Sequence, residues 1–178
     1  MKSESRSQSD IGSGDLSYRT IDPVRDRSAV VDFLVGGTWP FHGKSRPTVE
    51  QAARVKLGPP EEARAFWVVE HDERIGFIRL FDLEDADDGS VQFDLRIAVA
   101  HRGRGIGRQA VAWLTRYLFE TYPQLHRIEA STRADNDAMR RVLGQNGYRL
   151  EGLLRETWRS DDGTRYDTAL YGRLRHEA

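Results

Sequence analysis

One segment of the chain changes from a strand pattern to a helix pattern across a glycine-rich turn, and this change limits the possible folds more than any other feature. In residues 91–99, apolar and polar side chains alternate strictly, which is the period of a strand with one apolar face. After the turn, the apolar residues from Ile106 to Leu118 follow helical spacing. A strand therefore leads into a turn that begins a helix.

The same two patterns recur on both sides of this segment in a mixed order. The sequence predicts strands at residues 16–21, 65–70, 74–81, 91–99, 126–131, 149–159 and 165–173, and helices at 22–36, 48–57, 106–122 and 136–145. This order predicts one α+β domain, residues 16–178, with helices on both faces of the sheet. Residues 1–15 are rich in Ser, Gly and charge, and we expect them to form a flexible tail.

Composition excludes several classes of partner and chemistry. The 27 Lys and Arg residues nearly balance the 28 Asp and Glu residues, so no overall charge favours nucleic acid or an anionic membrane. The chain has no cysteine, and therefore no disulfide framework, thiolate metal site or thiol nucleophile. No apolar run is long enough for a signal peptide or a membrane span. We expect a soluble cytoplasmic protein that binds neither nucleic acid nor membrane and needs no metal.

The glycine-rich turn has the composition of a phosphate-binding site. Three glycines and three arginines occur in one short stretch: Arg102, Gly103, Arg104, Gly105, Gly107 and Arg108. Glycines let a ligand approach the backbone, and the free N–H groups around Ile106, at the start of the helix, point toward that ligand. Arginines add charge and paired donors. The turn predicts a site for the pyrophosphate of a nucleotide-like cofactor; the alternative is a connector with solvated arginines.

The spacing of the turn decides between the known phosphate-binding motifs. A dinucleotide site requires glycine where Arg108 stands, and no Gly-Lys-Ser/Thr sequence is present for a triphosphate. The turn instead resembles the R-x-x-G-x-G motif of the GNAT acetyltransferases, matched by Arg102, Gly105 and Gly107. Asn136, followed by Asn146-Gly147-Tyr148, resembles that family's asparagine and its later Gly-Phe pair. Residues 150–155 and 166–171 resemble the ribosomal-protein alanine N-acetyltransferase branch of the family.

This resemblance covers residues 16–173 and implies both a fold and a reaction. The implied sheet has six or seven mostly antiparallel strands with splayed central strands, and the implied reaction moves an acetyl group from acetyl-coenzyme A to a primary amine. The amine is a protein amino terminus or a small molecule, and a homodimer is left open. Ile97, Ala98 and Val99 would pair with the pantetheine arm, and one of their N–H groups would polarise the thioester carbonyl. Asn136 would help to hold the arm, and it also suits the cap of its own helix.

Transfer to an amine requires a group that removes a proton, usually a carboxylate or a water chain leading to one. Asp94, on the polar side of its strand, and Glu129, on the expected neighbouring strand, are the candidates. Each also suits a structural ion pair, with Arg96 or Arg127. The tyrosine that serves as the acid in many relatives falls at Leu143, which leaves Ser131 and solvent as candidates for the acid. Without a cysteine or a serine-elbow motif, we expect direct transfer with no covalent enzyme intermediate.

An irregular aromatic loop follows the first predicted helix. Trp39, Phe41 and His42 are candidates for the wall of the acceptor pocket; the alternative is that the two aromatic side chains cover the core. Because the expected tyrosine is missing, a catalytically silent sensor that binds acyl-coenzyme A is the alternative function.

Overall fold

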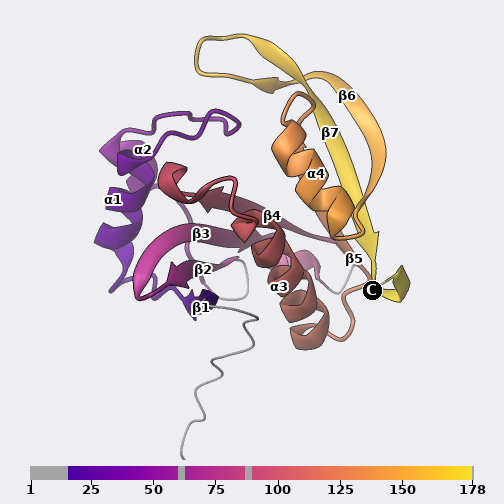
Figure 1. Ribbon diagram of the computed structural model, residues 1–178, viewed down its shortest axis with the longest axis horizontal. Helices are drawn as coiled ribbons and strands as arrows, with labels where there is room; N and C mark the ends of the chain where they lie inside the picture. The colour runs from indigo at the N-terminus through magenta and orange to yellow at the C-terminus, as the bar shows by residue number, and fades with distance from the viewer. Residues whose placement is uncertain (1–15, 60–62, 87–89, 178) are drawn as a thin grey trace, which may run out of the picture.

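The computed structural model describes residues 16–59, 63–86 and 90–177 (Figure 1). The predicted tail at residues 1–15 and part of the acidic turn, residues 87–89, lie outside the described residues.

Seven strands form one sheet in the order β1-β2-β3-β4-β5-β7-β6. The strands are β1 (Leu16–Thr20), β2 (Ala63–Glu70), β3 (Glu73–Phe81), β4 (Ser90–Ile97), β5 (Arg127–Arg133), β6 (Arg149–Arg159) and β7 (Arg165–Leu174). Every neighbouring pair is antiparallel except β4 and β5, which are parallel. The predicted order of elements and the mostly antiparallel sheet are confirmed.

Four helices cover the two faces of the sheet (Figure 1). Helices α1 (Arg27–Gly36) and α2 (Val49–Ala53) pack on one face, and α3 (Ile106–Thr121) and α4 (Asp137–Gln145) pack on the other. Consecutive residues of β3 serve different layers: Phe77 lies in the core under α1 and α2, and Ile78 lies in the core under α3 and α4. None of the described helices is long and apolar enough to cross a membrane.

The second helix is shorter than the sequence predicts. Thr48 caps it, and the side chain of Gln51 accepts a hydrogen bond from the backbone of Thr48 in return, which completes a capping box. The helix nevertheless ends at Ala53, and the prediction that it reaches Leu57 is wrong. Leu57 is buried in the core beside α1, and the segment between α2 and Pro59, which is neither helix nor strand, places it there.

The two parallel central strands separate, as the resemblance implies. β4 pairs with β3 from Gln92 to Ile97, but with β5 only from Ser90 to Gln92. β5 continues along β7 for its whole length instead. A wedge therefore opens between β4 and β5, with the first turns of α3 and α4 beside it (Figure 1).

Candidate active site

The turn between β4 and α3 presents free backbone donors. Gly103 and Gly105 have φ angles of 75° and 80°, a left-handed conformation that favours glycine, and each faces open space where a Cβ would project. The first helical hydrogen bond runs from Gln109 N to Gly105 O at 3.2 Å. The amides of Ile106 and Gly107 precede it and have no acceptor within the helix. The turn is therefore built to receive an anion.

Two of the predicted phosphate-binding arginines are bound within the protein, although Arg102 still lines the cavity beside the turn. Arg102 donates to Ile97 O at 2.8 Å and to Thr38 O at 2.7 Å, so it ties the end of β4 to the segment after α1. Arg104 donates to both carboxylate oxygens of Glu70 at 2.9 Å and does not line the cavity beside the turn. The structure therefore does not bring Arg104 to the phosphate site, because Glu70 neutralises it.

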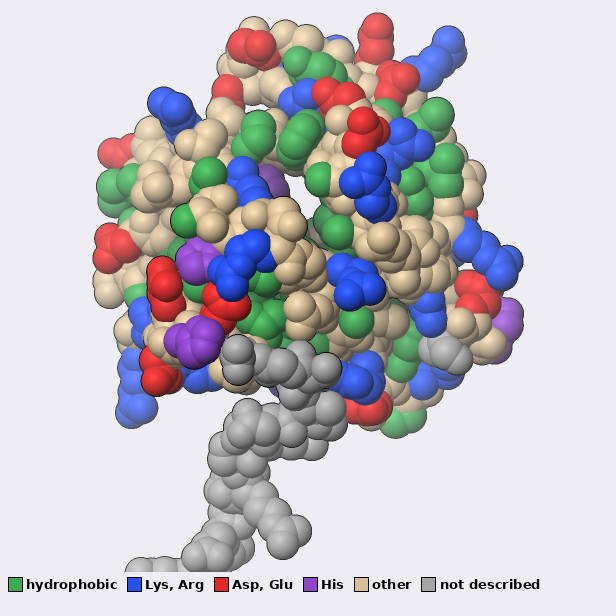
Figure 2. Space-filling model, in the orientation of Figure 1, with side chains coloured by type: hydrophobic (Ala, Val, Ile, Leu, Met, Phe, Trp, Pro, Cys, Tyr) green, Lys and Arg blue, Asp and Glu red, His purple; other side chains and the backbone are tan. Residues whose placement is uncertain are grey.

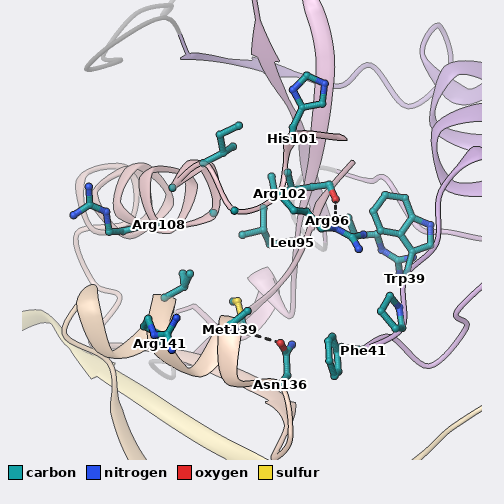
Figure 3. A pocket seen from close by; sticks show the side chains of 18 of the residues that line it. Trp39, Phe41, Leu95, Arg96, His101, Arg102, Arg108, Asn136, Met139 and Arg141 are labelled. Carbon is teal, nitrogen blue, oxygen red and sulfur yellow. Dashed lines mark hydrogen bonds between the residues drawn. The ribbon is translucent and has the colours of Figure 1, made fainter. Parts of the chain in front are cut away.

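Two other arginines face this cavity from opposite helices. Arg108 extends from α3 and Arg141 from α4, and both are exposed (Figure 3). Neither side chain has a hydrogen bond or an ion pair among the residues that the structure describes. The sequence analysis did not single out Arg141. The pattern that could have indicated it is a helix that begins at Asn136, a predicted cofactor-binding residue, and carries Arg141 in its second turn.

These two arginines give a test of the phosphate site. Replacing Arg108 and Arg141 together by glutamine is expected to weaken coenzyme A binding by about 10²- to 10⁴-fold at low salt, since charge-assisted contacts contribute roughly 1.5–3 kcal/mol each before screening. The loss should shrink as salt rises, and titration calorimetry at two salt concentrations measures it. Arg104→Gln is the control and should bind almost normally. An equal loss in Arg104→Gln would show that the phosphates lie on the Glu70 side.

The cavity beside the turn extends into the wedge between β4 and β5. Its volume is about 410 Å³, and Leu95, Ile97 and Asn136 are among its lining residues. Ala98 N donates to Ile75 O at 2.9 Å, so the Ala98 amide is committed to β3. By strand alternation, the amides of Leu95 and Ile97 point away from β3 into the wedge. Ile97, Ala98 and Val99 were the predicted partners of the pantetheine arm, and of these only Ile97 lines the cavity. Leu95, which was not predicted, lines it as well.

Asn136 lies at the edge of the same cavity. Its side chain accepts a hydrogen bond from Met139 N at 3.3 Å and donates to Thr132 Oγ1 at 2.9 Å (Figure 3). The predicted cap of α4 is therefore confirmed. Both polar atoms of the side chain are used within the protein, so Asn136 fixes where α4 begins relative to the wedge.

A second cavity of about 250 Å³ adjoins the first. The two share six lining residues, Phe41, His42, Leu95, Arg96, Asn136 and Met139. The second cavity continues past Asp94 and Ser131 to Trp158 on β6. A ligand in the wedge and a ligand in the second cavity would meet at the shared residues. The face drawn in Figure 2 is hollowed near its centre, with basic side chains beside the hollow.

A histidine–carboxylate pair lies where the cavities meet. His42 Nε2 is 2.9 Å from Asp94 Oδ1, and Arg96 Nε and Nη2 both lie 3.1 Å from Asp94 Oδ2. Burial alone would raise the pKa of Asp94, but the hydrogen bond from His42 and the charges of Arg96 and Arg79 outweigh it and hold this pKa well below its usual range. Asp94 is therefore a carboxylate, placed to accept a hydrogen bond from His42 Nε2; in the neutral tautomer that donates this bond, Nδ1 carries the lone pair. Nδ1 is buried and has no partner among the described residues.

Glu129, the second predicted base, does not reach either cavity. It is bound by Arg127 Nε at 3.0 Å, and Arg127 also binds Glu151 on β6. Leu143, at the usual tyrosine position, is fully buried and offers no hydroxyl. Ser131 is exposed and lines the second cavity, so it remains the candidate acid.

The aromatic loop after α1 divides into a core part and a pocket part. Trp39 is 1% exposed, its Nε1 donates to Leu34 O at 2.8 Å, and a Cβ on Gly37 would come within 2.0 Å of its ring. Phe41 is half-buried and lines both cavities. Ser45 binds Asp161 in the turn between β6 and β7, which holds the loop over the site. Trp39 therefore covers the core, which was the alternative for this loop, although Trp39 also lines part of the first cavity.

This division predicts different results for two aromatic substitutions. Trp39→Ala is expected to lower the free energy of unfolding by about 3–5 kcal/mol, because it removes a buried indole and leaves a cavity. Phe41→Ala is expected to leave stability nearly unchanged and to raise the Michaelis constant for the acceptor. Denaturant titration and steady-state kinetics measure the two effects. Equal loss of stability in both variants would contradict the division.

The wedge, the anion-binding turn and the two joined cavities form one continuous site that can take an anionic ligand beside a second molecule. A family model described as the acetyltransferase (GNAT) domain matches residues 20–149. The chain belongs to the GNAT acetyltransferase family.

Sequence relatives and solved structures agree with this family. The chain is 31% identical to an uncharacterized N-acetyltransferase p20 of Bacillus licheniformis over 62% of its own length, and it spans only 60% of that relative. It is 27% identical to the ribosomal-protein-serine acetyltransferase of Escherichia coli K12, over 76% of this chain and 75% of the relative. The ribosomal L7/L12 alpha-N-protein acetyltransferase RimL, solved with coenzyme A, superposes with a TM-score of 0.77 at 18% identity, covering 91% of this chain and 95% of RimL. The resemblance to ribosomal-protein acetyltransferases is confirmed.

Proposed function

We propose that this acetyltransferase transfers the acetyl group of acetyl-coenzyme A directly to a primary amine held in the second cavity. The observation that carries the proposal is the meeting of two cavities at one histidine–carboxylate pair. One cavity has the free amides and arginines that suit a pyrophosphate, and the other has a group able to take a proton. Both are needed for acetyl transfer to an amine.

On the donor side, the protein contributes binding and polarisation. Arg108, Arg141 and the amides after Gly105 hold the pyrophosphate, which suits a polyanion at a helix N-terminus. The edge of β4 in the wedge pairs with the extended arm of the donor. An amide of Leu95 or Ile97 then donates to the thioester carbonyl oxygen, where negative charge develops during attack.

On the acceptor side, His42 removes the proton that the amine must lose. His42 lines both cavities, and its Nδ1 is buried without a partner among the described residues, so a small shift of the loop or one inserted water connects Nδ1 to the amine. Asp94 is a positioning residue: it fixes the tautomer of His42 and balances the imidazolium that forms. The sequence-based hypothesis that Asp94 itself is the base is thus modified, since Asp94 is already bound by His42 and Arg96.

Direct transfer is tested by two-substrate kinetics. Varying acetyl-coenzyme A at several fixed amine concentrations is expected to give intersecting double-reciprocal lines, because both substrates must be bound together. Parallel lines, or an acetylated protein in the absence of amine, would mean that the enzyme itself is acetylated first.

A further inference from the structure

Arg79 is an arginine of the second cavity that the proposed reaction does not use. It lies on β3 directly opposite Asp94 on β4, and both side chains line the cavity. Its guanidinium carbon is 5.0 Å from the centroid of the Phe81 ring. Its Nε is buried without a hydrogen-bond partner. Among the described residues, no carboxylate lies within ion-pair distance of it.

The charged neighbours of Arg79 are already engaged. Asp94 is bound by His42 and Arg96, and Asp82 accepts a hydrogen bond from Gln92 at 3.2 Å. Arg96 adds a second positive charge to the cavity lining. Burial lowers the pKa of Arg79, with smaller contributions from Asp94, Arg96 and Asp82, yet a guanidinium stays charged at any working pH.

A partly buried cation without a direct counter-ion is costly, and an anion placed against it recovers that cost. Asp94 is the single carboxylate in the described lining of the cavity, and it is occupied. The anion must therefore come from outside the described protein. Since the cavity is also where the amine enters, the acceptor is the molecule that can supply it.

We propose that Arg79 binds a carboxylate of the acceptor, so that the preferred substrates are amines that also carry a carboxylate. Because Arg79 and Asp94 face each other across neighbouring strands, the carboxylate lies close to the amine that His42 deprotonates. The source is either a free amino acid or a peptide amino terminus with an acidic residue beside it. A polyamine is disfavoured, since it would place further positive charge beside Arg79 and Arg96. This inference rests on the proposed function.

The test compares matched acceptors with the full-length protein and saturating acetyl-coenzyme A. Alanine is paired with alaninamide, and a short amidated peptide with glutamate at its second position is paired with its glutamine counterpart; spermidine is the cationic acceptor. We expect a kcat/KM for the preferred carboxylate acceptor about 10- to 100-fold above that of its neutral partner, the range of a charge-assisted contact. The pair that shows the preference identifies the source of the carboxylate.

Variants then assign the preference to Arg79. Arg79→Met is expected to abolish the preference, measured as the ratio of kcat/KM within each pair, which a loss common to both acceptors through Asp94 does not change; Arg79→Glu is expected to favour spermidine. Arg74→Met is the matched control, because Arg74 lies on the same strand and lines neither cavity. Arg79→Lys keeps the charge and should retain part of the preference. The Arg79→Met protein should be at least as thermally stable as wild type, since an uncompensated charge has been removed.

Different failures have different meanings. Equal kcat/KM for carboxylate and neutral acceptors in the wild-type protein would overturn the inference and leave the proposed function intact. A preference that survives in Arg79→Met, or an equal loss for both acceptors in that variant, would also overturn it. Acetylation of no amine at all would overturn the proposed function, and the inference with it.

Discussion

Gly107→Trp is expected to abolish coenzyme A binding and leave the protein folded. Gly107 lies in the first turn of α3 and lines the first cavity, and its nearest neighbour for an added Cβ is Val142 Cγ2 at 3.8 Å, an ordinary contact. Its φ is not in the left-handed region, so a larger residue brings no backbone strain there. An indole would fill the space beside the free amides and exclude the pyrophosphate. Losing two charge-assisted contacts weakens binding by about 10²- to 10⁴-fold.

Calorimetric titration with coenzyme A measures this loss, and thermal unfolding reports on the fold. Gly107→Ala is the control, because a methyl group fits in the available space and should change affinity little. Normal binding by a folded Gly107→Trp protein would mean that the phosphates bind elsewhere. Gly105 is a less useful position for this test, since its φ of 80° would strain any other residue.

His42→Ala is expected to lower turnover by about 10²- to 10⁴-fold, the usual contribution of a general base. Asp94→Asn should lower turnover in the same direction by releasing the imidazole. Coenzyme A affinity should hardly change in either variant. Added imidazole should restore part of the activity of His42→Ala, because it can occupy the vacated space beside Asp94; a merely structural role would not respond to it.

Two controls accompany this measurement. His126→Ala removes an exposed histidine outside both cavities, and Glu129→Gln removes the carboxylate bound by Arg127. Both should retain nearly normal turnover. If Glu129→Gln loses activity while His42→Ala keeps it, the proton path runs along β5 and the assignment to His42 fails.

Most of the fold could be predicted from the sequence, because the patterns that indicate it involve residues close together in the chain. The alternation in residues 91–97, the left-handed glycines of the turn and the cap at Asn136 each act within a few residues, and the structure bears them out; the strand predicted to reach Val99 ends at Ile97, and Val99 begins a 3-10 turn. The helices differ at their ends: α1 begins at Arg27 rather than at residue 22, and the helical spacing up to Leu57 reflected burial of Leu57 in the core rather than a continued α2. Apolar spacing alone does not distinguish the two.

The site was predicted less completely, because side chains on separate strands and loops meet only in the folded chain. Glu70 and Arg104 are 34 residues apart, and nothing in the local pattern indicates that they pair. The contact of His42 with Asp94 joins residues still farther apart in sequence, so the sequence favoured a carboxylate as the base. The sequence analysis did not single out Arg79, because the mostly apolar pattern of residues 74–81 does not show whether this side chain has a partner. Its lack of a partner is visible only from its neighbours.

We propose that two substrates meet at His42 and Asp94 and that an acetyl group passes between them. The most direct test measures free thiol released from acetyl-coenzyme A, together with the mass of the amine, for the wild-type protein and a panel of primary amines. We predict thiol and N-acetylated amine in equal amounts, with both strongly reduced in His42→Ala. Tight binding of acetyl-coenzyme A without thiol release on any amine would contradict the account and identify the protein as an acyl-coenzyme A sensor.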